Sequence, residues 1–406
     1  MSRSTRISCE HPIPMNICYI SHVDISLPNG PGVNEREFLL TLREESLLRG
    51  DQASCIIPKP SLPLDTPVPD AHFFQPSLPI SRFPSLNRLL ANAWLAGLII
   101  GLTLKYGYDL YILRISRTGL FIPVLLRLLG KPYSMKTLGN TMKFNKAERR
   151  PWHERAVTLI FRKILRDSLT TDVCTPQLEK SYRSGYGVDN IQVIDNAVNV
   201  ERFLPLDREE CRRACGLKEF DRIVGYCGGR PSERGARQLV EISPRLIERY
   251  PGAGIVIIGE DQDLDTLKIK ARDSGLSDRI RFMGTIPYTE LNPFLNCFNV
   301  GVALDTAQRI DLIGNSSQKI RQFIACGIPV ICAGNTNTGL IREKLGSWVD
   351  PGDPEQLLHE ICSWFDLPGD QIPQFRDKAR RYAEENLSTR IAYAKRYSAW
   401  KKAMHG

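Results

Sequence analysis

The sequence lacks the features that mark several specialised classes of protein. It contains no short repeat and no low-complexity segment, and it has only six histidines. Its eleven cysteines include no Cys-x-x-Cys pair, which argues against a disulfide framework and against a zinc site. An ordinary apolar content of 42 % excludes disordered, collagenous and coiled-coil architectures. We therefore expect a globular protein of a reducing, cytoplasmic compartment.

The sequence also lacks an apolar run long enough to cross a bilayer. Residues 89–104 form the longest apolar stretch, and their sixteen positions fall short of the roughly eighteen that a spanning helix needs. We interpret this stretch as a buried helix, with a segment that dips into a membrane as the alternative. The first fourteen residues are polar and have no signal-peptide core, so we expect a disordered tail over 1–14.

Acidic residues are scarce in one part of the chain. The net charge is +9, and residues 1–200, with 24 basic and 17 acidic side chains, contribute +7 of it. Residues 131–166 alone hold ten basic and two acidic side chains. Three interpretations stay open for this basic window: a solvated charged face, a surface that binds the inner face of an anionic membrane, and a nucleic-acid site, which is the least favoured.

Strands alternate with helices in two separate series. Apolar runs typical of strands, such as those at 16–20, 110–113 and 133–138, are separated by helical patterns, and the same rhythm restarts over 222–332. Each series predicts a parallel sheet covered on both faces by helices. The predicted fold class is thus α/β, with two doubly wound, Rossmann-like domains facing a cleft.

Five motifs follow one another along these series. They occupy residues 193–203, 228–235, 257–259, 279–284 and 315–330. Their order and spacing resemble the pattern of the group-4 family of retaining GT-B glycosyltransferases, of the glycosyl transferases group 1 type. The first motif reads Val193-Ile-Asp-Asn-Ala-Val-Asn and is similar to the family's V-I-P-N-G-V-D. The resemblance covers residues 16 to about 390.

The resemblance implies a GT-B fold with a division of labour between its domains. Residues 15–200 are expected to bind the acceptor, residues 201–385 the nucleotide sugar, and residues 386–406 to include a helix that crosses back to the first domain. The implied reaction moves a sugar from a nucleotide-diphosphate donor to an acceptor hydroxyl with retention of configuration, without a metal or other cofactor. We expect the acceptor to be a lipid-linked or cell-surface glycan precursor.

Two arginines and one helix start are candidate phosphate-binding groups. A departing diphosphate carries about two negative charges and needs fixed positive partners. Arg230 and Arg234 follow a predicted strand on a glycine-rich loop, so we expect them to be catalytic, and the alternative is a pair of solvated loop arginines. The amides that begin the helix after 315–317 form a phosphate cradle, or a serine simply caps them. The expected donor-binding residues are Gly30, Gly32, Asn315, Ser316, Ser317, Gln318, Lys319 and Gln322.

Two positions in the second half depart from the family pattern. Gly314 and Gln322 stand where the family has two glutamates eight residues apart. Gln322 can still form hydrogen bonds with ribose hydroxyls. The missing first carboxylate leaves Asp311 and Asp305 as the nearest acidic candidates for contact with the donor sugar. Either is otherwise an ordinary loop carboxylate.

The first half departs from the pattern as well. Leu138 stands where many members carry a histidine that contacts the donor sugar. Of the histidines left in this half, His22 at the end of the first predicted strand is a better candidate for sugar or acceptor contact than His153. A second pattern, Asp261-Gln-Asp263, is compatible with a metal pair, but we favour a solvated turn.

These departures motivate two further hypotheses. The first is a catalytically degenerate GT-B protein that binds a nucleotide sugar or a partner protein without turnover. The second is an epimerase of the same fold that acts on the nucleotide sugar itself, which is less favoured because such an enzyme needs several carboxylates and histidines in its cleft.

Overall fold

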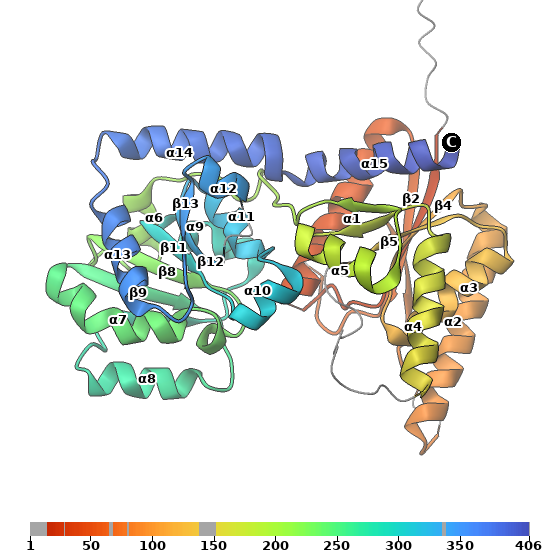
Figure 1. Ribbon diagram of the computed structural model, residues 1–406, viewed down its shortest axis with the longest axis horizontal. Helices are drawn as coiled ribbons and strands as arrows, with labels where there is room; N and C mark the ends of the chain where they lie inside the picture. The colour runs from red at the N-terminus through yellow and green to blue at the C-terminus, as the bar shows by residue number, and fades with distance from the viewer. Residues whose placement is uncertain are drawn as a thin grey trace, which may run out of the picture.

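The computed structural model describes residues 14–27, 29–64, 68–78, 81–137, 152–334 and 338–405. Two α/β domains lie side by side, and the C-terminal helix lies along the first of them (Figure 1). The predicted class of fold, with two doubly wound parallel sheets, is confirmed. Leu138, residues 1–13 of the predicted tail and residues 138–151 of the basic window lie outside the described residues.

The first domain is built on a seven-stranded sheet in which every neighbouring pair is parallel. The strand order is β3-β2-β1-β4-β5-β6-β7, so the direction of winding reverses between the neighbours β1 and β4. Five of these strands carry only buried residues in their centre, as a sheet covered on both faces requires. The strands are β1 (Asn16–Ser21), β2 (Gln52–Pro58), β3 (Asp70–Phe74), β4 (Leu110–Arg114), β5 (Tyr133–Lys136), β6 (Thr171–Val173) and β7 (Ile191–Val193).

Helices cover both faces of this first sheet. Apolar side chains of α2, α3, α4 and α5 pack in one core cluster on one face. Side chains of α1 and of the C-terminal helix pack in a second cluster on the other face. The helices are α1 (Gly30–Arg49), α2 (Pro84–Tyr106), α3 (Phe121–Leu128), α4 (Trp152–Asp167) and α5 (Pro176–Tyr186), with the short 3-10 turn η1 (Arg117–Gly119) before α3.

The second domain repeats the plan with six parallel strands in the order β10-β9-β8-β11-β12-β13. Here the winding reverses between β8 and β11. The strands are β8 (Arg222–Cys227), β9 (Ala253–Ile258), β10 (Ile280–Gly284), β11 (Val300–Ala303), β12 (Val330–Ala333) and β13 (Gly346–Val349). The helices and short helical turns are α6 (Arg208–Ala214), η2 (Pro231–Glu233), α7 (Ala236–Arg249), α8 (Leu264–Asp273), η3 (Tyr288–Glu290), α9 (Leu291–Asn296), α10 (Ala307–Ile313), α11 (Gln318–Ala325), α12 (Thr338–Arg342), α13 (Pro354–Phe365), α14 (Gln371–Tyr382) and η4 (Ala383–Leu387). The last helix, α15 (Thr389–His405), lies on the first domain.

The chain crosses between the domains twice, and the two crossings lie against each other. Val198, on the way to the second domain, pairs with Ser388, on the way back. The Val198 amide donates to the Leu387 carbonyl at 2.8 Å, and the Thr389 amide donates to the Val198 carbonyl at 3.1 Å. A π-helical turn, η4, immediately precedes this return, and a π turn of this kind often marks a functional position.

Helix α15 is held on the first domain by apolar packing and by one buried ion pair. Tyr393, Tyr397 and Trp400 pack with α1 and the first sheet, and Trp400 is fully buried. Arg396 Nε donates to Asp172 Oδ2 of β6 at 2.8 Å, and both side chains are buried. The pair therefore connects the end of the chain to the sheet of the first domain.

The expectation of a buried helix over residues 89–104 is wrong for one face of that helix. These residues lie in α2, which packs Leu95, Ile99 and Leu102 into the core. The opposite side exposes Leu89, Trp94 and Leu104 to solvent. By length and composition alone, α2 is a helix that could cross a membrane.

Removing the buried arginine of α15 should destabilise the protein strongly. Arg396→Ala leaves the buried Asp172 carboxylate without its cation, and such a loss costs about 3–5 kcal/mol of unfolding free energy. Urea unfolding followed by circular dichroism measures it. The matched control is Arg390→Ala on the same helix. The Arg390 side chain is about half exposed, so its pairs with Glu201 and Glu45 contribute less than about 1 kcal/mol. Equal losses for the two variants would contradict this account of α15.

Candidate functional site

The loop after β8 forms one wall of the candidate site, at the point where the strand order of the second sheet reverses. Ligands of open parallel sheets bind at such a point, outside the carboxyl ends of the strands. Gly228 begins this loop with φ of 136°, and Gly259 of the next loop has φ of 123°. A Cβ atom on Gly259 would lie 2.1 Å from the Gly228 carbonyl oxygen, so the loops after β8 and β9 are in direct backbone contact. Only glycine at Gly259 permits this contact.

Lys319, in the first turn of α11, lies against the same loop. Its ammonium lies 3.8 Å from the centre of the Tyr226 ring, and a Cβ on Gly228 would lie 3.4 Å from its Cε. The side chain is buried, and its Nζ donates no hydrogen bond to any residue within the described ranges. Burial lowers the pKa of Lys319 to about 7, and the neighbouring charge of Arg234 adds to this effect. A buried, unsatisfied cation at this position suits an anionic ligand.

Arg234 is the second cation of the site, and Asp305 holds it. Asp305 follows β11, the other strand at the reversal point, and is buried. Its carboxylate lies 3.5 Å from Arg234 Nε and accepts a hydrogen bond from Arg309 Nε at 2.8 Å. Asp305 is therefore the charge partner of two arginines and of the nearby Lys319. Of the residues that the sequence offered as phosphate-binding, Arg234 and Lys319 are brought together here.

Arg230 is placed differently from Arg234. It adopts the left-handed conformation with φ of 57°, and its side chain is two-thirds exposed. Its guanidinium lies 3.3 Å from the carboxylate of Glu233, an exposed residue of the adjacent turn η2. Arg230 is thus paired at the surface. Asp261 accepts hydrogen bonds from the Ser232 amide and hydroxyl, each at 2.8 Å. The Asp261 carboxylate thus fixes the turn that carries Arg230.

The segment before α11 joins the two domains. Ser316 Oγ donates to Asp195 at 2.8 Å, and Gln318 Nε2 donates to the Ala197 carbonyl at 2.5 Å. The Ser316 carbonyl in turn accepts from Asn196 at 2.7 Å. Ser317 is the residue before the helix, and its side chain makes no capping hydrogen bond. Asn315 is buried and donates to the Ala333 carbonyl at 3.1 Å.

Gln322 lies at a second contact between the domains. It meets the phenol of Tyr288, and Glu37 of α1 reaches the same phenol from the first domain. Burial raises the pKa of Tyr288 well above its usual value, and the Glu37 carboxylate adds to the rise. Arg202 lies 3.6 Å from Glu37 and 5.2 Å from the centre of the Tyr288 ring.

Gly314 has no room for the glutamate that the family pattern has at this position. It ends α10 with φ of 68°, and a Cβ there would lie 2.7 Å from Gln177 Oε1 and 3.0 Å from Thr175. Thr175 Oγ1 donates to the Ile313 carbonyl at 2.6 Å, and this hydrogen bond holds the end of α10 against the start of α5. Asp311, on the same helix, is exposed.

The candidates in the first domain lie at the corresponding reversal point, between β1 and β4. His22 packs between Phe74, with ring centres 5.4 Å apart, and Gly119, whose Cβ would lie 2.4 Å from the imidazole. Burial lowers the pKa of His22 to about 4, so it is neutral at pH 7. The Gly32 amide donates to Asn29 Oδ1 at 2.9 Å, while Gly30 has open space around it.

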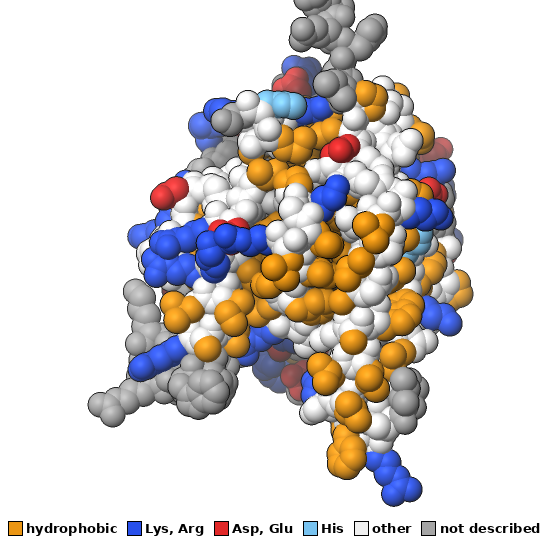
Figure 2. Space-filling view, turned by 90° about the vertical axis from the view of Figure 1, so that its right-hand side faces the viewer, with side chains coloured by type: hydrophobic (Ala, Val, Ile, Leu, Met, Phe, Trp, Pro, Cys, Tyr) orange, Lys and Arg blue, Asp and Glu red, His pale blue; other side chains and the backbone are white. Residues whose placement is uncertain are grey.

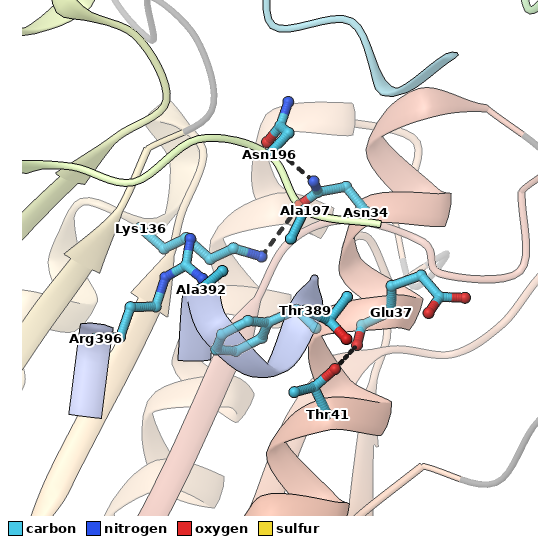
Figure 3. A pocket seen from close by; sticks show the side chains of 10 residues that line it. Asn34, Glu37, Thr41, Lys136, Asn196, Ala197, Thr389, Ala392 and Arg396 are labelled. Carbon is cyan, nitrogen blue, oxygen red and sulfur yellow. Dashed lines mark hydrogen bonds between the residues drawn. The ribbon is translucent and has the colours of Figure 1, made fainter. Parts of the chain in front are cut away.

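A group of buried charges behind this point was not predicted from the sequence. Glu35 of α1 accepts hydrogen bonds from Arg114 of β4 and from Lys136 of β5, the latter at 2.8 Å. Burial alone would raise the pKa of Glu35, but the two cations outweigh it and lower the pKa to about 2. Figure 3 shows the pocket beside them, where Asn34, Lys136, Asn196 and Arg396 converge from α1, β5, the linker and α15. The one sequence feature that could have indicated this group is the acidic residue Glu35 within the first predicted helix.

Known proteins resemble parts of this chain in sequence. Residues 221–366 match the model of the family described as Glycosyl transferases group 1. The chain is 25 % identical over 238 residues to the D-inositol 3-phosphate glycosyltransferase of Corynebacterium urealyticum, a match that covers 55 % of this chain and 54 % of that protein. The chain thus spans about half the length of the curated relatives it matches.

Solved structures resemble the chain over nearly its whole length. The sucrose-phosphate synthase of Thermosynechococcus elongatus superposes with a TM-score of 0.71 at 18 % identity, over 96 % of this chain and 98 % of that chain. HepE of Anabaena, in complex with UDP, superposes with a TM-score of 0.70 at 13 % identity, over 96 % and 100 % of the two chains. The fold is therefore GT-B, as expected.

Substitution of the glycine under the loop should destabilise the site. Gly259→Ala forces a side chain into a left-handed conformation and against the Gly228 carbonyl, and we expect a loss of about 1–3 kcal/mol in unfolding free energy. Thermal unfolding measures it. Gly229→Ala is the control, because a Cβ there meets nothing within 4 Å, and its effect should stay within about 0.5 kcal/mol. A tolerated Gly259→Ala would show that the two loops are not in close contact.

Proposed function

We propose that the protein is a retaining glycosyltransferase that moves a sugar from a nucleotide-diphosphate donor to an acceptor hydroxyl. The observation that carries the proposal is the buried, unsatisfied ammonium of Lys319 beside Arg234 and the Gly228 loop. We assign the donor to the second domain, residues 201–385, and the acceptor to the first domain, residues 15–200. A match of residues 221–366 to a glycosyltransferase family supports the assignment of the donor.

The cations of the site supply what departure of a diphosphate requires. When the bond between the sugar carbon and the phosphate oxygen breaks, its electron pair stays on the diphosphate, and Arg234 and Lys319 stabilise that charge. The amides that begin α11 add a helix N-terminus to the same anion. The acceptor oxygen forms the new bond to the sugar carbon on the same face, and its proton passes to the leaving phosphate. No residue of the protein acts as a nucleophile in this scheme.

The names of the similar proteins support a nucleoside diphosphate as the leaving group. The HepE structure contains UDP, and the curated relative in Corynebacterium urealyticum is named for glycosyl transfer. We propose a lipid-linked or cell-surface glycan precursor as the acceptor, a cytoplasmic location at the inner face of a membrane, and a reaction that needs no metal. Within the described part of the chain, no group of three or more His, Cys, Asp or Glu is arranged to hold a metal ion.

A second candidate function is a GT-B protein that binds a nucleotide sugar without turnover. Gly314 favours it, because the position cannot accommodate the missing carboxylate while α10 rests on Thr175. Gln322 favours it as well, since its side chain meets Tyr288 at the domain contact. Turnover with an acceptor distinguishes the two functions, and conversion of the donor without any acceptor would instead indicate an epimerase.

Binding of UDP should be coupled to uptake of a proton by Lys319. With a pKa of about 7, Lys319 is largely neutral at pH 8, and a bound diphosphate raises that pKa. We expect affinity to fall between pH 7 and pH 9 and calorimetry at pH 8, in buffers of different ionisation enthalpy, to show uptake of up to about one proton. Lys319→Met should abolish the uptake and weaken binding at least about tenfold.

The control for this measurement is Lys268→Met, which removes an exposed lysine paired with Asp265 on α8. Its binding should follow the wild-type pH profile. Proton uptake that persists in Lys319→Met would remove Lys319 from the donor site.

Transfer itself is tested with a panel of nucleotide sugars and hydroxyl acceptors, with products detected by mass spectrometry. Arg234→Ala should lower the rate at least about a hundredfold, as loss of one charge-stabilising donor does elsewhere. Retained circular dichroism confirms that the variant folds. Wild-type rates in Arg234→Ala would overturn the assignment, and binding without any product from wild-type protein would favour the non-catalytic function.

A further inference from the structure

Helix α2 presents to solvent a face that carries no charge over most of its length. Between Arg88 and Lys105, residues 89–104 include no charged residue, and these sixteen positions span about 24 Å of helix at 1.5 Å per residue. Leu95 and Ile99 face the core and are buried. Five large apolar side chains on the other side are exposed: Leu86 at 41 %, Leu89 at 63 %, Leu90 at 36 %, Trp94 at 48 % and Leu104 at 79 %. A continuous apolar surface of this kind marks a site of interaction.

The apolar surface continues onto the neighbouring helices. α3 and α4 cover the same face of the first sheet as α2, since all three contribute to one core cluster. Val124 and Leu128 of α3 and Leu159 and Ile160 of α4 are exposed as well. Figure 2 shows hydrophobic side chains gathered over this end of the first domain, with Lys and Arg side chains beside them.

The charges around this surface are mostly positive. Residues 81–137 contain eight basic side chains, of which Arg114 and Lys136 are buried on Glu35, and one acidic side chain, Asp109; Asp167 of α4 pairs with Arg127. Arg82, Arg88 and Lys105 are exposed at the two ends of α2, and Arg127 of α3 is more than half exposed. Such a rim attracts an anionic surface. It repels a second copy of the same face, so self-association is disfavoured.

The core contacts of α2 decide how it would meet a bilayer. A spanning α2 would have to withdraw Leu95, Ile99 and Leu102 from the cluster that they share with the sheet strands. Burying only the outer face costs none of these contacts. Trp94 and Tyr106 are exposed on this helix, and their amphipathic rings favour the boundary between headgroups and acyl chains. The helix therefore suits a position in the plane of the interface.

We propose that the outer face of α2, extended by α3 and α4, is a docking surface for an anionic lipid bilayer. The chemistry that recognises it is an apolar interior below negatively charged headgroups. This surface overlaps the basic window at 131–166 only in α4, because its centre is apolar and lies on α2. The proposal rests on the proposed location at a membrane and names the surface that binds there, but it is tested apart from glycosyl transfer, since binding to lipid is measured without donor or acceptor.

Sedimentation of the full chain with vesicles tests the proposal. Vesicles of phosphatidylcholine and phosphatidylglycerol should bind the protein at 50 mM NaCl at least about tenfold more tightly than pure phosphatidylcholine, and 500 mM NaCl should weaken the binding. Leu89→Gln combined with Trp94→Gln should weaken binding at least about tenfold, because it removes two apolar contacts while leaving every charge.

The matched control is Leu47→Gln combined with Leu48→Gln, two leucines of α1 that are 71 % and 74 % exposed on the other face of the sheet. This variant should bind like the wild type. Arg88→Gln combined with Lys105→Gln should weaken binding about fivefold per charge. The proposal would be overturned if the α2 variant (Leu89→Gln with Trp94→Gln) and the α1 control (Leu47→Gln with Leu48→Gln) bound vesicles equally well. Absence of binding by the wild type at 50 mM NaCl would overturn it too. So would self-association that only the α2 variant abolishes, without any binding to vesicles.

Discussion

Parallel pairing of every strand in both sheets is the constraint on which the rest of the structure depends. Parallel strands need crossover helices, which bury both faces of the sheet and bring all carboxyl ends to one edge. At the reversal between β8 and β11 this edge collects the Gly228 loop, Asp305 and the start of α11. Residues far apart in sequence, such as Arg234 and Lys319, thereby lie around one carboxylate. The site follows from topology, and only its details depend on individual side chains.

Sequence reasoning could predict the sheets because their strands are continuous apolar runs, whose signal is local. It could also predict the loop of Arg234, since glycines after a strand mark a close approach of backbone. It could not predict that Ser316 and Gln318 hydrogen-bond across the domain junction, because their partners Asp195 and Ala197 come from another domain. Spacing within one segment carries no information about such partners.

The exposed face of α2 was missed for a related reason. Composition shows that a helix is apolar, but which side it buries depends on the elements that cover it. In this fold α2 lies on the outer side of the first sheet, with Leu95 and Ile99 inward, and no described element covers Trp94 or Leu104. Gly97 and Gly101 lie on the outer face, and a Cβ atom added at either position would have no atom within 4 Å. Nothing in the described structure therefore covers these two positions.

The two reversal points differ in how their buried charges are satisfied. In the first domain, Arg114 and Lys136 both donate directly to Glu35, so each of these cations already has a carboxylate partner. In the second domain, one carboxylate, Asp305, faces Arg234, Arg309 and Lys319, and Lys319 keeps an ammonium without a hydrogen-bond acceptor among the described residues. The two arginines leave an excess of about one positive charge over Asp305, and protonation of Lys319 on binding would raise it to about two, which matches a diphosphate. This difference supports the proposed assignment of the anionic donor to the second domain.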